Sequence, residues 1–119
     1  MPEKNELLEW PDGSKFKGEV KDGVPHGQGE MEFANGSRYA GAWLNGKMHG
    51  LGTFDFLNGS SYTGDFVDGL QDGTGIMTWP DGTKHVGEFK EGKKHGQGTT
   101  TYADGATHTG MWLGGQFWG

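Results

Sequence analysis

Residues 39–52 read Tyr-Ala-Gly-Ala-Trp-Leu-Asn-Gly-Lys-Met-His-Gly-Leu-Gly, and this pattern of aromatic residues and glycines returns every 23 residues. Steps of 23 from Gly41 reach Gly18, Gly64, Gly87 and Gly110, with no insertion or deletion between them. A fixed period of this length indicates an array of small stacked units rather than one globular core. The repeat determines the expected fold, and it is stronger evidence for that fold than any single motif.

Each repeat has the pattern of a β-hairpin. Within residues 14–36, apolar or glycine positions alternate with polar ones over 14–20 and again over 26–33, which is typical of half-buried strands. Asp22-Gly23 between the two strands is a turn sequence, because Asp and Gly tolerate positive φ. We therefore predict an all-β fold, an elongated single-layer ribbon of about five antiparallel hairpins, about 50 Å long and almost free of helix.

The 119-residue chain is predicted to be one repeat array. A lone opening strand is expected over residues 6–10. The repeats are expected to start near residues 14, 37, 60, 83 and 106, and the last is incomplete. Glycine inside a strand suggests that another group approaches the backbone closely. We expect aromatic rings from neighbouring strands to lie over Gly41, Gly52, Gly64 and Gly75.

Composition excludes several classes of function. The chain has no cysteine, so disulfides, thiolate metal sites and cysteine nucleophiles are excluded. A net charge of −6 and an isoelectric point near 5.2 argue against binding to nucleic acid. No apolar stretch approaches the ~20 residues of a transmembrane helix, and no secretory signal pattern is visible. We expect a cytoplasmic protein, with peripheral attachment to a membrane as an alternative.

The residues that could carry chemistry do not form a recognisable catalytic or metal site. His26, His49 and His95 share one repeat position, and His85 and His108 share another. Equivalent residues of adjacent hairpins lie two strands apart, about 9–10 Å, which is too far for two of them to bind one zinc ion. The glycine pairs lack the following helix that a nucleotide-binding loop needs. We therefore expect no metal, no cofactor and no enzymatic activity.

Residues 39–52 resemble the MORN (membrane occupation and recognition nexus) repeat, whose pattern is Tyr-x-Gly-x-Trp-x-x-Gly-x-x-x-Gly-x-Gly. Residues 62–75 repeat it closely, and the resemblance extends over residues 7–119. Two positions depart from the pattern: His85 and His108 replace the first aromatic, and Phe66 and Phe89 replace the tryptophan. The resemblance implies a grooved ribbon of hairpins that serves as a scaffold, a dimerisation module or a docking surface, and in some members a role at membrane lipids.

Protein binding, including self-association, is the first functional hypothesis. It places the contacts on the aromatic–glycine face and on the C-terminal edge, where an unpaired strand is a template for another chain. The predicted partner-binding residues are Tyr39, Trp43, Tyr62, Phe66, Trp112, Phe117 and Trp118. The alternative at this edge is that Phe117 and Trp118 fold back over Trp112 as an intramolecular cap.

Peripheral binding to anionic phospholipid is the second hypothesis. Basic residues gather only in the fourth repeat, and clustered lysines attract acidic headgroups at about 1 kcal/mol each. The predicted lipid-binding residues are Lys84, Lys90, Lys93 and Lys94. The overall acidity favours the protein partner. A third reading is that the chain is the docking fragment of a larger protein.

Overall fold

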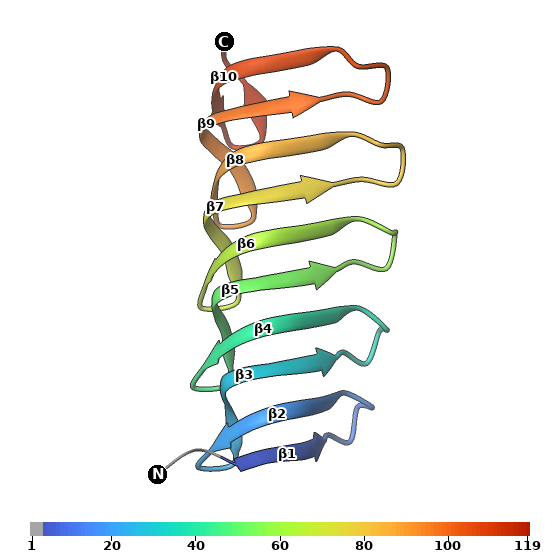
Figure 1. Ribbon diagram of the computed structural model, residues 1–119, viewed down its shortest axis with the longest axis vertical. Coiled ribbons are helices and arrows are strands. Elements are labelled where there is room, and N and C mark those ends of the chain that lie inside the picture. Colours follow the sequence, from blue (N-terminus) through green and yellow to red (C-terminus); the bar gives the residue numbers. More distant parts are fainter. Residues whose placement is uncertain (1–3) are drawn as a thin grey trace.

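The computed structural model describes residues 4–119, which form one open antiparallel sheet whose 11 strands follow one another in chain order (Figure 1). No helix occurs in this part of the chain. The strands are β1 (Lys4–Glu9), β2 (Lys15–Lys21), β3 (Val24–Glu32), β4 (Arg38–Leu44), β5 (Lys47–Asp55), β6 (Ser61–Val67), β7 (Leu70–Thr78), β8 (Lys84–Lys90), β9 (Lys93–Thr101), β10 (Thr107–Leu113) and β11 (Gln116–Phe117).

The predicted hairpin ribbon is confirmed. The molecule measures 48 × 26 × 19 Å, close to the expected length. The strand bounds differ slightly from the prediction, because the opening strand covers Lys4–Glu9 and the first hairpin pairs Lys15–Lys21 with Val24–Glu32. These shifts lie at strand ends, where the alternation of apolar and polar residues is weakest.

Two-residue turns close the hairpins. Asp22, Asn45, Asp68 and Glu91 have φ of 49–51°, and the glycine after each has φ of 80–87°. Positive φ at both central residues is the geometry of a type I′ turn, which matches the twist of the flanking strands. The hairpin tips are also bonded to one another, since Gly46 N–H donates to the Pro25 carbonyl at 2.9 Å. The same bond recurs one repeat later from Gly69 to Met48, at 2.8 Å.

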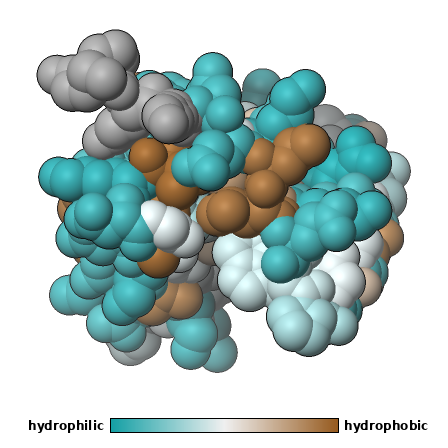
Figure 2. All heavy atoms as spheres, turned by 90° about the horizontal axis from the view of Figure 1, so that it is seen from below, coloured by the Kyte–Doolittle hydropathy of each residue, from teal (hydrophilic) through white to brown (hydrophobic). Residues whose placement is uncertain are grey.

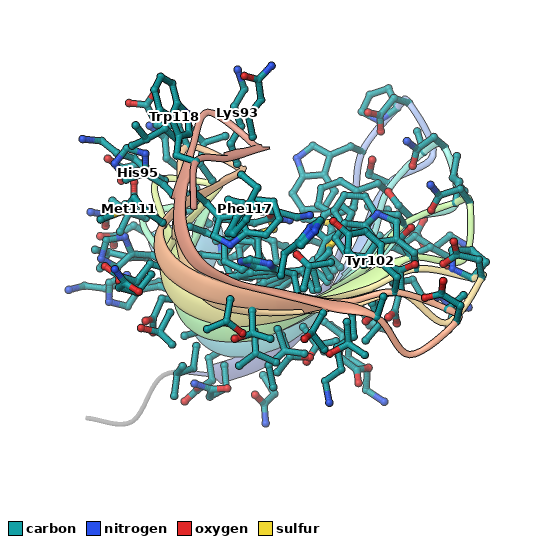
Figure 3. The ribbon with its side chains drawn as sticks, turned by 90° about the horizontal axis from the view of Figure 1, so that it is seen from above. Lys93, His95, Tyr102, Met111, Phe117 and Trp118 are labelled. Carbon is teal, nitrogen blue, oxygen red and sulfur yellow. The ribbon has the colours of Figure 1, made fainter. Side chains whose placement is uncertain are left out.

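A bulge bends every hairpin. Gly18 pairs with Gly29 and Val20 pairs with Pro25, so Glu19 alone faces residues 26–28. A bulge of this kind bends a strand and increases its twist. Because the bulge recurs at the same place in each repeat, the bends add up, and the ribbon becomes a trough that Figure 3 shows end-on.

Rings inside the trough link one repeat to the next. Tyr39 contacts Trp43 of its own strand at a centroid distance of 5.1 Å and Phe66 of the next repeat at 4.9 Å, both edge to face. Tyr62 makes the same pair of contacts with Phe66 and Phe89. Such pairs are worth about 0.5–1.5 kcal/mol beyond the area they bury. The chain of rings is therefore the core.

Glycines make room for these rings. A Cβ atom on Gly52 or Gly75 would collide with the ring of Tyr39 or Tyr62, which confirms the prediction for those two positions. For Gly41 and Gly64 the prediction was partly wrong. A Cβ there would collide mainly with the backbone of the next strand, and the ring it would meet belongs to its own strand.

Candidate functional site: a groove along the trough

Three columns of side chains build a groove inside the trough. The wall beside the inter-repeat turns consists of one aromatic per repeat, namely Trp10, Phe33, Phe56, Trp79 and Tyr102. The floor consists of Leu8, Met31, Phe54, Met77 and Thr100. The wall on the hairpin arm consists of Pro25, Met48, Gln71, Lys94 and Phe117. Members of one column are 23 residues apart, so the repeat itself lines them up.

The groove is apolar over the first three repeats. Phe54 packs against Phe33 at a centroid distance of 5.6 Å and against Phe56 at 4.6 Å. These rings, with Met48 and Met77, line a hollow of about 620 Å³ and are partly buried against the core. Viewed from the N-terminal end, apolar side chains gather in the middle of the molecule between hydrophilic margins (Figure 2). This stretch of the groove offers apolar surface to a partner.

The groove continues towards the C-terminal end. A second hollow shares Gln71 and Met77 with the first, and a third shares Trp79 and Lys94 with the second. The three hollows are therefore one path along the long axis. In Figure 3, Tyr102 and Phe117 lie on the inner side of the trough, whereas His95 and Met111 point outward.

A polar cluster stands at this end. The Lys94 ammonium lies 4.5 Å from the ring centroid of Trp112 and 5.0 Å from that of Trp79, and it donates to Thr100 Oγ1 at 3.3 Å. Thr100 Oγ1 lies 2.7 Å from His85 Nδ1. Because an ammonium only donates, the Thr100 hydroxyl accepts from Lys94, and the same oxygen is hydrogen-bonded to His85 Nδ1, with the imidazole tautomer setting which of those two atoms donates.

Burial sets the charge of this cluster. Burial first, and the Lys94 charge second, lower the pKa of His85 to about 4, so its imidazole is neutral near pH 7. Burial also lowers the pKa of Lys94. His85 Nε2 is buried and has no hydrogen-bond partner within residues 4–119. The cluster therefore places the Lys94 cation between two indoles, at a groove end that Asp81 and Lys93 also line.

Carboxylates at the bulges bond to the backbone, a role that the sequence analysis did not assign to any acidic residue. Asp65 Oδ2 accepts from Thr74 N–H at 3.0 Å, and Glu88 Oε2 accepts from Gln97 N–H at 2.9 Å. Glu19 Oε2 accepts from the backbone of Gln28 in the same way. The signal was the 23-residue spacing of these acids. They fix the bend that forms the trough.

The family follows from the same repeat. The model of the MORN repeat matches residues 16–38, 39–61, 62–84 and 85–107, each match one full period of the array. The chain belongs to the MORN repeat family. No curated protein matches it. MORN repeats are interaction modules, and no helix within residues 4–119 is long and apolar enough to cross a membrane.

The MORN repeats place most of the predicted partner-binding aromatics in the core. Tyr39 and Tyr62 are fully buried, and the remaining three are at most 5% exposed, namely Trp43, Phe66 and Trp112. Direct contact of these rings with a partner stays a prediction. The aromatics that line the groove are instead those of its walls and floor, such as Phe33 and Phe56, which sequence reasoning did not single out although they also recur every 23 residues.

The two C-terminal aromatics have different surroundings. Phe117 stacks on His108 at a centroid distance of 4.7 Å and contacts Trp112 at 4.9 Å. It therefore covers the last core ring, as the intramolecular-cap alternative expects. Trp118 does not join it and remains 67% exposed. Self-association through this end stays a prediction, with Trp118 as its available anchor.

The predicted lipid-binding lysines do not share one surface. Lys84 is exposed and alternates with buried His85, so it lies on the outer face of the sheet. Lys90 and Lys93 pair across the hairpin tip, and Lys94 lies inside the groove. Lys90 and Lys93 are brought together at the tip, with the acidic Glu91 in the turn between them, and Lys93 also lines a hollow together with Lys94. Lipid binding by this set stays a prediction.

Proposed function

We propose that this MORN array is a protein-binding module whose groove receives an amphipathic helix of a partner. The observation that carries the proposal is the continuous apolar path lined by Phe33, Met48, Phe54, Phe56 and Met77. Exposed apolar surface of this kind marks interaction sites. A sheet face with an apolar stripe is stabilised when a helix covers it.

The backbone of the trough favours a helix over an extended peptide. The strands around the groove pair with both neighbours, so their N–H and C=O groups are already used in the sheet. An extended segment lying in the groove would bury its own backbone groups without partners, which costs free energy. A helix satisfies its backbone internally and presents only side chains.

Binding to anionic membranes is the weaker alternative. The four lysines that suggested it lie on three surfaces, and the net charge of the chain is −6. The hairpin tips carry lysines beside acidic turn residues, so their charges largely compensate. Co-sedimentation with phosphatidylserine vesicles at low and high salt separates this reading from the groove, because groove binding needs no lipid.

The proposal is tested by selecting helical 18-residue peptides from a random displayed library against the whole chain. The groove variant carries Met48→Gln and Phe54→Thr, which are the residues found at the equivalent positions of other repeats. The control variant carries Leu51→Gln on the outer face, where Leu51 is 70% exposed and Gln28 and Gln97 are its equivalents.

We expect amphipathic peptides whose affinity falls at least tenfold in the groove variant and stays unchanged in the control. Binding should also shift the methyl resonances of Met48 and Met77. Selected peptides that bind both variants equally, or that shift no groove methyl, would contradict the proposal.

A further inference from the structure

Lys94 interrupts a wall that is otherwise uncharged. Its equivalents in the first three repeats are Pro25, Met48 and Gln71, which fill the same place without a charge. The floor changes in the same repeat, where Thr100 follows Met31, Phe54 and Met77. The groove is thus apolar at one end and cationic at the other.

The Lys94 ammonium is incompletely satisfied. It has three N–H donors, and within residues 4–119 its one hydrogen bond is the 3.3 Å contact to Thr100. No carboxylate of these residues forms an ion pair with it. Asp81, the acid nearest in the same hollow, uses Oδ1 to accept from Thr83 N–H at 2.8 Å. The remaining donors are available to a ligand.

The surroundings hold the ammonium in place. The indoles of Trp79 and Trp112 contact the cation at 5.0 and 4.5 Å, and ring faces attract cations. The other titratable groups at this end are Tyr102, Asp81, Lys93 and His85, and His85 is neutral because burial lowers its pKa. The hollow beside Lys94 measures about 510 Å³ and is bounded by Pro80 and Tyr102. Asp81 accepts from Thr83 N–H through Oδ1, and Lys94 offers an incoming anion a cation held between two indoles.

We infer that Lys94 receives a carboxylate side chain of the bound helix. This inference rests on the proposed function, and it adds a chemical requirement for the partner and a direction of binding. Partial burial between two indoles strengthens a charge-assisted hydrogen bond relative to one in water. An acid at the other end of the helix would meet Met48 and Phe33 instead and would be buried without a partner.

The repeat geometry fixes where the acid lies. Met48 and Lys94 are equivalent residues two repeats apart, so four strand spacings separate them, about 19 Å. A helix rises 1.5 Å per residue, so the acid follows or precedes the apolar anchor over Met48 by about 13 residues. The partner helix therefore has apolar residues over two to three turns and one Asp or Glu near its far end.

The experiment repeats the peptide selection with the whole chain and with its Lys94→Met variant, which carries the residue of position 48. The matched control is Lys84→Met, which removes an exposed lysine of the same repeat on the outer face of the sheet. We expect an Asp or Glu to be enriched at one position in peptides selected by the native chain and by the control, and not in those selected by Lys94→Met. A Glu→Gln change in such a peptide should weaken binding to the native chain about tenfold and leave binding to Lys94→Met unchanged.

Failure of the carboxylate site and failure of the groove proposal give different results. Peptides that need Met48 and Phe54 but show no Glu–Gln difference between the native chain and Lys94→Met would overturn the carboxylate site while leaving the groove intact. Peptides that ignore the Met48 and Phe54 changes would overturn the groove itself. An equal loss of acid preference in Lys94→Met and Lys84→Met would show a general charge effect and would also overturn the site.

Discussion

The ring of Tyr39 stands edge-on to the ring of Phe66, one repeat further along the sheet, with their centroids 4.9 Å apart. The same relationship links Phe16 to Trp43 at 5.3 Å and His85 to Trp112 at 5.0 Å. A ring of each hairpin thus packs against a ring of the next hairpin, and no hairpin forms a complete core by itself. In such arrays stability is close to a sum of repeat and neighbour terms. A substitution of one ring should therefore also lower the stability of the adjoining repeat.

Gly52→Val should destabilise the protein by about 1–3 kcal/mol, because overpacking a filled core costs that much. The new Cβ would collide with the Tyr39 ring, which cannot move without losing Trp43 and Phe66. Urea unfolding followed by tryptophan fluorescence measures the loss. The control is Leu51→Val at the preceding residue, which is 70% exposed on the outer face and should change stability little. Equal stability of the native chain and Gly52→Val would refute the stacked-ring core.

Asp65→Ala should cost about 1 kcal/mol, since it leaves the Thr74 N–H at the bulge without its acceptor. The second repeat has Ala42 at this position, so the reverse change is available within the same chain. Ala42→Asp should raise the free energy of unfolding by a similar amount, by adding the acceptor for the backbone of Leu51. Denaturant titrations of the two variants test both the expected loss of stability in Asp65→Ala and the expected gain in Ala42→Asp. A loss of stability in Ala42→Asp would contradict the assigned role of the bulge acids.

Acid should destabilise the fold through His85. Its pKa in the folded state, about 4, lies below the ordinary value of 6.5, so the unfolded chain binds the proton first. The contribution of His85 to stability should therefore be complete above pH 6.5, be lost between pH 6.5 and 4, and change no further below that range. The full loss is roughly 3 kcal/mol, at 1.36 kcal/mol per pH unit.

His85→Tyr, which restores the residue found at positions 39 and 62, should remove this part of the pH dependence. Urea titrations of both proteins at pH 7, 5.5 and 4.5 give the comparison. Parallel stability curves over the three pH values would show that His85 is not the acid-sensitive group.

Phe117→Ala should lower the melting temperature, because it removes the ring that covers Trp112 and stacks on His108. Trp118→Ala should leave it almost unchanged, since that indole is 67% exposed. Sedimentation of the same two variants tests self-association. If Trp118 anchors a second copy, the native chain sediments as a dimer and Trp118→Ala as a monomer. A monomeric mass for the native chain removes self-association.

The hairpins were predictable from sequence because alternation, turn residues and the 23-residue period all point to the same fold. The trough was implied only by the family resemblance, because its bend depends on a bulge in which Glu19 faces residues 26–28, and strand alternation does not show how many residues of one strand face one residue of its partner. Nor does the alternation show that Lys94, rather than the exposed Lys93 beside it, lies against the rings of Trp79 and Trp112.

The division of the aromatics between core and groove was equally unpredictable from the sequence. Tyr39 and Phe54 lie on the same side of neighbouring strands and are paired in the ladder, yet Tyr39 is buried and Phe54 partly exposed. The difference arises because the Tyr39 ring lies down over Gly52, whereas no glycine makes such room for Phe54. The glycines thus mark the first core ring of a repeat, such as Tyr39 and Tyr62, whereas the second core ring, such as Trp43 or Phe66, is buried without one.

The bonds between hairpin tips, from Gly46 to Pro25 and from Gly69 to Met48, bear on how the array responds to tension. The strands run across the long axis, so a pull on the two ends loads the ladder bonds one after another rather than all together. Each hairpin that opens frees 23 residues, about 75 Å of chain, in place of the about 10 Å that it spanned. Stretched in an optical trap, the protein should lengthen in equal steps of roughly 65 Å, one per repeat, and behave as an extensible tether rather than a rigid rod.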